Sequence, residues 1–199
     1  MKKTTVTLLV IGAIVVLLIL SFIGPYNNII KKEETVSQAW ANVESAYQRR
    51  LDLIPNLVKT VQGSADFEKG TLEAVVNARS KASSVQVDAD NLDENAVAQF
   101  QAAQDQLTSA LNRLMVVVER YPELKSTQGF LELQSQLEGT ENRIAVERNK
   151  FNEAVQGYNS YIRRFPTNII AGIFNFDRKG YFKASEGAEN APSVDFNFD

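Results

Sequence analysis

A run of apolar residues near the N-terminus constrains this chain more than any other feature. No charged residue lies between Lys3 and Lys31, and the apolar part extends over the 18 residues 6–23. As a helix rising 1.5 Å per residue, it spans about 27 Å, close to the roughly 30 Å hydrocarbon layer of a bilayer. We therefore predict a transmembrane anchor over residues 1–25. Its representative lipid-facing residues are Val6, Leu9, Ile14, Leu18 and Ile23.

A cleaved signal peptide is the main alternative interpretation of this run. The run exceeds the usual 7–15 apolar residues, and no small-residue cleavage site follows it, so an uncleaved anchor is favoured. Two lysines flank each end, Lys2 and Lys3 before the run and Lys31 and Lys32 after it. The first pair lies closer to the apolar run, which favours an N-terminus inside and the bulk of the chain outside.

Beyond the anchor, apolar residues recur at intervals of three and four, the spacing of amphipathic helices. The spacing predicts helices over residues 26–62, 66–84, 93–120 and 127–164, with a polar connection over 85–91. Pro55 lies inside the first of these helices, so we expect a kink or a short break around Leu53–Asn56. The predicted fold is all-α, with residues 26–172 forming an elongated antiparallel bundle of about four helices.

Each predicted bundle helix has a stripe that is expected to face the core. In helix 66–84 the stripe is Phe67, Leu72, Val75, Ala78 and Ala82. In helix 93–120 it is Val97, Phe100, Gln104, Leu107, Leu111, Leu114, Val118 and Tyr121. In helix 127–164 it is Phe130, Leu133, Leu137, Thr140, Ile144, Glu147, Phe151, Ala154, Tyr158, Tyr161 and Phe165. This sustained alternation predicts coiled-coil-like packing at about 20°.

Polar residues interrupt the stripes at Gln104, Thr140 and Glu147. We interpret them as register control, because a buried polar group that needs a partner disfavours slipped alignments. A binding or catalytic role is the alternative. The expected partners of Glu147 are Arg49, Arg50, Arg143 and Arg148.

Charged residues collect around Pro55. A proline cannot donate a backbone hydrogen bond, so the carbonyl near Leu51 is free to accept from an Arg or Asn side chain. We expect a kink held by satisfied polar contacts; an ion-pair site formed with Glu119 or Glu141 is the alternative. The predicted structural polar cluster is Arg49, Arg50, Asp52, Pro55, Glu119, Glu141, Arg143 and Glu147.

The last part of the chain, residues 173–199, is expected to be a tail that is partly extended or mobile. The apolar segment 167–176 before and within it fits a brief helix on the end of the bundle, or an interfacial segment touching lipid or a neighbouring subunit. Near the C-terminus, apolar and polar residues alternate as in a β-strand, which needs a partner to pair with. The predicted oligomer contacts are Val194, Phe196 and Phe198, and a frayed tail is the alternative.

The chain has no Cys and no His among its 199 residues. These absences exclude disulfides, Cys-ligated zinc, Ser-His-Asp triads and HExxH metal sites. The net charge of −3 gives no electrostatic reason to expect nucleic-acid binding. We expect no catalytic residues, no cofactor, no metal and no small-molecule substrate; an enzyme using carboxylates such as Glu141 and Glu147 is the disfavoured alternative.

The sequence resembles the LemA family of bacterial membrane-anchored proteins. The resemblance covers nearly the whole chain and is strongest in four stretches. They are AWANVESAYQRRLDLIPNLVKTVQG (39–63), TLEAVVNARSKA (71–82), LNRLMVVVERYPELKSTQGFLELQSQLEGTENRIAVERNKFNEAVQGYNSYIRRFPTNIIA (111–171) and YFKASEGAENAPSVDF (181–196). Members commonly have a His where this chain has Phe67. The resemblance implies a membrane anchor and an antiparallel helical bundle without established enzymatic activity.

The resemblance and the sequence pattern together predict a single-pass protein of the bacterial inner membrane. Flanking charge favours a bundle on the outer, periplasmic side, whereas the family resemblance implies a cytoplasmic bundle, and both sides stay open. We expect a self-associating scaffold or adaptor in membrane organisation, with the lipid bilayer and further copies of the chain as partners. The alternative is a regulatory subunit or sensor that binds another membrane protein, such as a protease or transporter.

Overall fold

One helix connects the N-terminal apolar run to the bundle. In the computed structural model, which describes residues 3–63 and 68–184, helix α1 (Lys3–Gln62) runs unbroken for 60 residues. At 1.5 Å per residue this is about 90 Å. The break expected around Leu53–Asn56 is therefore wrong, because the helix continues through Pro55.

The interruption at Pro55 is compensated by a side chain from a neighbouring helix. The carbonyl of Leu51, one turn before the proline, accepts a hydrogen bond from Arg79 Nε at 2.9 Å. This is the kind of donor expected for the carbonyl that a proline leaves without its helical partner. Arg79 lies on α2 (Lys69–Ser84), so the same contact ties α1 to α2.

The bundle is built from two antiparallel helix pairs. Helix α1 packs along α5 (Gln128–Ile162), and α2 packs along α3 (Glu94–Val118). Side-chain oxygens cap the two longer bundle helices, since Asp93 accepts from Ala96 N at 2.7 Å and Thr127 accepts from Phe130 N at 3.4 Å. The described residues contain helices and no strand, which confirms the all-α bundle.

A short helix, α4 (Pro122–Lys125), separates α3 from α5 and was not expected. Its proline, Pro122, occupies the first helical position. A backbone N–H at this position would have no intrahelical acceptor, so a proline is tolerated there. Leu124 is its one buried residue and packs into the core at this end of the bundle.

Two clusters of buried side chains fill the bundle. The cluster near α4 includes Ile54, Leu57, Leu107, Leu114 and Phe130. The cluster at the other end is rich in aromatic residues, among them Trp40, Tyr47, Phe100, Phe151 and Phe182. The ring centroid of Trp40 lies 5.1 Å from that of Phe100 and 5.3 Å from that of Phe151. Aromatic pairs interact favourably at these separations.

The predicted stripes match the buried faces except at the end of α5. Leu72, Val75, Ala78 and Ala82 are the buried residues of α2, and Phe67 lies outside the described residues. Along α5 the match holds from Phe130 to Phe151 and again at Tyr158, and Val155 and Ile162 are buried as well. Ala154 and Tyr161 are half-buried and pack against the core. The prediction was wrong at Phe165, which lies beyond the end of α5 and is 82% exposed.

After α5 the chain turns across the end of the bundle and runs back along it. Helix α6 (Thr167–Phe174) packs against α1 and α5, with Ile170 and Ala171 buried. Residues 175–184 then form an extended segment, here called the strap, which lies on the bundle. The predicted oligomer contacts Val194, Phe196 and Phe198 lie outside the described residues.

Three side-chain amides hold the strap to the bundle. Asn159 bonds both the N–H and the carbonyl of Lys179, each at 2.9 Å. Asn152 does the same for Phe182 at 2.9 Å, and Gln101 for Lys183 at 3.0 Å. Each amide therefore pairs with one backbone residue as a neighbouring strand would, which satisfies the polar groups of an extended segment without a sheet.

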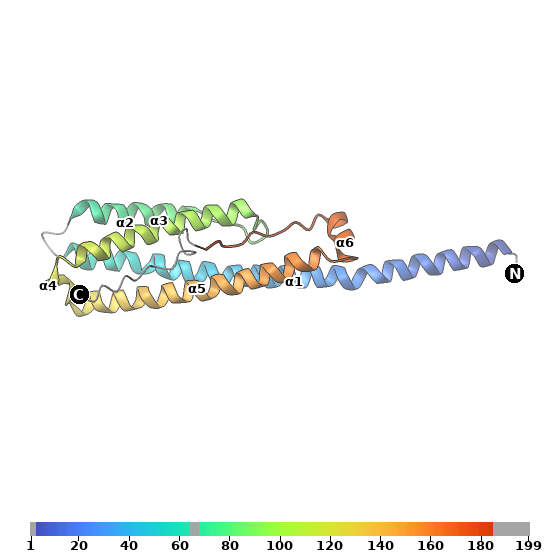
Figure 1. The fold of residues 1–199 in the computed structure, drawn as a ribbon, viewed down its shortest axis with the longest axis horizontal. Helices are drawn as coiled ribbons and strands as arrows, with labels where there is room; N and C mark the ends of the chain where they lie inside the picture. The colour runs from blue at the N-terminus through green and yellow to red at the C-terminus, as the bar shows by residue number, and fades with distance from the viewer. Residues whose placement is uncertain (1–2, 64–67, 185–199) are drawn as a thin grey trace, which may run out of the picture.

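The N-terminal part of α1 projects beyond the bundle (Figure 1) and carries exposed apolar side chains. Leu8 is 70% exposed and Ile23 is 49% exposed, and Ile29 is the first of the described side chains of α1 to be buried. In the part of the chain that the structure describes, no helix has the length and apolar character needed to span a membrane. The anchor over residues 1–25 stays a prediction.

Candidate functional site

The polar centre of the bundle is the guanidinium of Arg50. This side chain comes from α1, is 2% exposed and lies between the two hydrophobic clusters. A buried charge is costly unless other groups replace its hydration, so its partners decide what the site can do.

The direct partners of Arg50 come from two other helices, α3 and α5. Arg50 Nη1 donates to Thr108 Oγ1 at 2.9 Å on α3 and to Glu141 Oε2 at 3.0 Å on α5. Arg50 Nη2 donates to Gln104 Oε1 at 2.7 Å and to the Gln104 carbonyl at 3.3 Å. The amide nitrogen of Gln104 in turn lies 3.5 Å from the carbonyl of Ala82 at the end of α2. The guanidinium thus joins α1, α3 and α5 directly, and α2 through Gln104.

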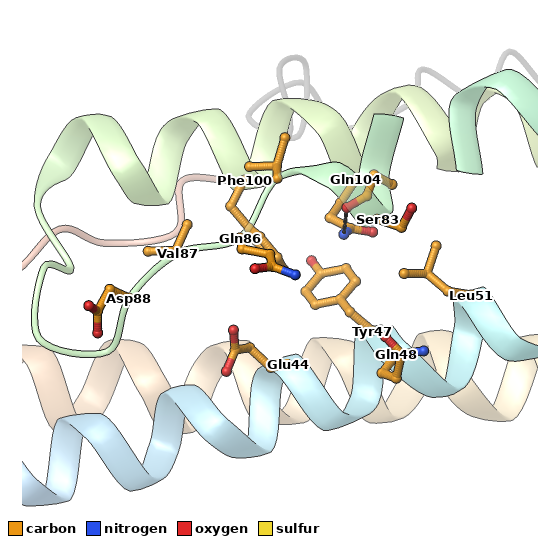
Figure 2. Close-up of a pocket in the computed structure, with 12 residues that line it drawn as sticks. Glu44, Tyr47, Gln48, Leu51, Ser83, Gln86, Val87, Asp88, Phe100 and Gln104 are labelled. Carbon is orange, nitrogen blue, oxygen red and sulfur yellow. Dashed lines mark hydrogen bonds between the residues drawn. The ribbon is translucent and has the colours of Figure 1, made fainter. Parts of the chain in front are cut away.

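A groove of about 540 Å³ lies beside this centre, between α1, α3 and the connection that follows α2 (Figure 2). Tyr47 and Gln104 line it on the side of the network, and Glu44, Gln86 and Asp88 add polar groups. The Arg50 guanidinium also stacks on the ring of Tyr47, 5.0 Å from its centroid. A second hollow of about 310 Å³ lies on the other side of Arg50 and is lined by Glu141 and Thr108.

Burial perturbs two acids that line the larger groove. It raises the pKa of the Glu44 carboxyl. It also raises the pKa of the Tyr47 hydroxyl, with the charges of Arg148 and Arg50 acting in the opposite direction. Both shifts come mainly from desolvation, which disfavours the charged form.

The structure brings together only two of the residues predicted as one cluster, Arg50 and Glu141, whose charged atoms lie 3.0 Å apart. Asp52 accepts from Gln48 at 2.7 Å, one turn earlier on the same helix. Glu119 pairs with Lys125 at 2.5 Å, near α4 and away from Arg50. Arg49 and Arg143 are exposed.

Glu147 pairs with Lys150 at 3.1 Å, so none of the four arginines expected as its partner forms that pair. Its second carboxylate oxygen, Oε2, is buried and has no hydrogen-bond partner among the described residues. Arg148 turns to the strap instead, donating to the Lys183 carbonyl at 2.8 Å and lying 4.8 Å from the ring centroid of Phe182. The ordered strap provides this competing partner, which the sequence did not reveal.

The sequence analysis also missed several groups that organise the bundle. Gln104 was noticed as a polar interruption, but its bond to Arg50 was not foreseen. The amides that bind the strap include Asn152 and Asn159, which are seven residues apart and so share one face of α5. That spacing on a long helix was the one available clue.

The polar groups around Arg50 and Glu147 are directed mainly to contacts within the protein. The hydrogen-bonded Nη1 and Nη2 donors of Arg50 are directed to protein acceptors on α3 and α5, and its carboxylate partner Glu141 is 53% exposed. Glu147 and Glu141 lie on different sides of α5, since one side chain is 7% exposed and the other 53%. The described residues include no group of three or more acidic side chains arranged to hold a metal ion.

Comparisons with known proteins match nearly the whole bundle. The model of the LemA family matches residues 39–196. Protein LemA of Metamycoplasma hominis is 25% identical over 165 residues, covering 83% of this chain and 72% of that protein. Magnetosome protein MamQ 2 of Paramagnetospirillum magneticum is 29% identical over 188 residues, covering 85% of this chain and 68% of that protein. Magnetosome protein MamQ of Magnetospirillum gryphiswaldense is 28% identical over 193 residues, covering 85% and 70%.

Proposed function

Because this chain belongs to the LemA family, we propose that it is a non-enzymatic, membrane-anchored bundle that self-associates as a scaffold or adaptor in membrane organisation. The proposed location is the bacterial inner membrane, crossed once by the N-terminal part of α1. The relatives named magnetosome proteins support membrane organisation as the class of role.

The observation that carries this proposal is the projecting, apolar part of α1. Its exposed large apolar side chains are Leu8, Leu9, Val10, Ile11, Ile14, Val16, Leu20 and Ile23, each between 49% and 70% exposed. At about 25 cal/mol per Å² of apolar surface, leaving so many side chains in water is unfavourable, whereas lipid covers them. The helix continues without a break into the bundle, so the anchor and the bundle move together.

The bundle itself supports a role as a rigid spacer. The Arg50 network connects all four long helices, and the strap adds backbone hydrogen bonds to α3 and α5. Both terminal nitrogens of Arg50 have partners, whereas its buried Nε has none among the described residues. A buried hydrogen-bond network that depends on the alignment of several helices favours one packing arrangement over alternatives. A rigid bundle keeps the surface at its far end in a fixed position relative to the bilayer, as a scaffold requires.

Light scattering on the full chain in a mild detergent tests the scaffold proposal. We expect a protein mass well above that of one 22.2 kDa chain. A matched variant with Val194, Phe196 and Phe198 all changed to Ser is expected to shift toward the monomer, because the alternating C-terminal segment is proposed to pair between chains. A clean monomer of the unchanged protein at every concentration contradicts the scaffold.

Affinity capture with the anchor intact separates the scaffold from the regulatory alternative. A scaffold that self-associates retains differently tagged copies of its own chain. A stoichiometric second protein, recovered in place of tagged copies, favours a regulator of a membrane protease or transporter. The control is a chain without residues 1–25, which is not concentrated on the membrane.

Protease added to intact spheroplasts tests the side of the membrane. Lys2 and Lys3 lie closer to the apolar run than Lys31 and Lys32, so we propose a bundle on the outer side. Digestion of the bundle in intact cells supports this side. Protection that disappears only after lysis places the bundle in the cytoplasm.

A further inference from the structure

Helix α6 presents an apolar face that the bundle does not cover. Ile170 on the inner face is 1% exposed, so α6 is anchored to the bundle. On the outer face, Ile169 and Ile173 are 44% and 61% exposed. Phe165, two residues before the helix, is 82% exposed, and Phe174 at the C-terminal end of the helix is 54% exposed.

Ring contacts fix this face beside the root of the projecting helix. The ring centroid of Tyr26 on α1 lies 5.0 Å from that of Phe174 and 5.8 Å from that of Phe176. Tyr26 follows Ile23, the last exposed residue of the projecting apolar part, by three positions, or about 4.5 Å along the helix axis. The exposed face of α6 therefore lies within about one helical turn of the level where that apolar part ends (Figure 1).

The charges around α6 are mainly positive. Arg163 and Arg164 precede the helix and Arg178 follows it, and all three are exposed. Asp177 is the one acidic residue between positions 163 and 178. An apolar helix face bordered by arginines is the combination that lies in the headgroup region of a bilayer containing anionic lipid.

We propose that the exposed face of α6 inserts into the headgroup region of an anionic bilayer and seats the bundle on the membrane. This inference rests on the proposed anchoring by α1. The axis of α6 runs across the long axis of the bundle (Figure 1), so a membrane that α1 crosses lies along α6 rather than against its end. The root of the anchor and α6 then form two contacts with the same surface, which fixes the tilt of the bundle.

Spin labels at single introduced cysteines test this proposal, since the chain has no native Cys to interfere. The full chain is reconstituted into phosphatidylcholine vesicles containing phosphatidylglycerol, with the label at Leu9, Ile173 or Val116 in separate variants. Val116 is the matched control, because it is 70% exposed and lies on α3 near the far end of the bundle. The measurement compares collisions of each label with oxygen and with a water-soluble nickel chelate.

The proposal predicts that oxygen collisions exceed chelate collisions at Leu9 and Ile173, and that the order is reversed at Val116. If the label at Leu9 contacts lipid but the label at Ile173 contacts water, the proposed role of α6 is wrong and the anchoring by α1 still holds. Water at Leu9 overturns the anchoring itself. Dipolar broadening at Ile173 without lipid contact identifies a second copy of the chain as the occupant and also overturns the proposal. Changing Arg163 and Arg164 to Gln is expected to reduce the oxygen preference at Ile173 while leaving Leu9 unchanged.

Discussion

Replacing Arg50 and Gln104 separately and together tests whether the polar centre of the bundle is a coupled unit. In Arg50→Met, the buried Gln104 Oε1 loses the donor that lies 2.7 Å away. A stranded buried acceptor costs about 1–3 kcal/mol. The Glu141 carboxylate is 53% exposed and can be hydrated by water once Arg50 is replaced. Loss of the Arg50–Glu141 ion pair therefore adds about 1 kcal/mol at most to the cost. The expected total is about 1–4 kcal/mol.

The single change Gln104→Leu strands a donor of Arg50 in the same way and costs about 1–3 kcal/mol. In the double variant neither Arg50 nor Gln104 leaves the other stranded, and Thr108 Oγ1 still donates to the backbone carbonyl of residue 104, at 3.2 Å in the unchanged protein. The Ala82 carbonyl loses its 3.5 Å contact with Gln104 in Gln104→Leu and in the double variant alike, so this loss cancels in the comparison. The double variant is therefore expected to be less destabilised than the sum of the single changes by about 1–3 kcal/mol.

Denaturant unfolding of the full chain in detergent measures these differences. The single tryptophan, Trp40, is fully buried in the aromatic cluster, so its fluorescence reports loss of the bundle core. The control pair is Gln48→Ala with Asp52→Ala, a hydrogen-bonded pair on the exposed side of α1. If the costs of the Arg50 and Gln104 changes add within about 0.5 kcal/mol, the two residues are not coupled and the reasoning is refuted.

Three further predictions follow from the strap and the groove. Gly180→Ala places a Cβ 2.7 Å from the Asp93 carbonyl oxygen and is expected to cost about 1–3 kcal/mol of unfolding free energy, measured by Trp40 fluorescence; an unchanged midpoint contradicts the close approach. Phe182→Ala removes a buried ring from the aromatic cluster and is expected to cost about 3–5 kcal/mol and to speed proteolysis within the strap. Glu44→Gln is expected to raise the melting temperature at neutral pH, because the raised pKa of Glu44 means that the folded state disfavours its charge. That advantage should disappear as the pH falls below 4.5, the ordinary value for this carboxyl, and an advantage that grows on acidification has the wrong sign.

The helical stripes were predictable because burial follows the helix period closely. All four residues named on α2 from Leu72 to Ala82 are buried, as is the stripe of α3 from Val97 to Val118. Pro55 predicts that a side chain donates to the carbonyl near Leu51, because the proline has no N–H to do so. Only the structure identifies that side chain as Arg79. Sequence patterns within a single helix were therefore sufficient to predict which of its residues are buried.

Most of the missed features depend on contacts between distant segments. The strap has no sheet and no helix, and its order comes from amides on α3 and α5 that bind its backbone. Glu147 was assigned to arginines, but its nearest cation is Lys150 on its own helix, and Arg148 is occupied by the strap. The network around Arg50 needed the relative register of three helices, which a sequence pattern with a period of 3.5 to 3.6 residues does not fix.

Membrane retention after an alkaline carbonate wash tests the central claim most directly. The full chain is expected to stay with the membrane pellet, because the projecting part of α1 carries exposed apolar side chains that we propose are inserted in lipid. A chain without residues 1–25 is the comparison, with its helical circular dichroism confirming a folded bundle, and it is expected in the wash. Release of the full chain into the wash, together with the truncated chain, contradicts the account of a bundle anchored through α1.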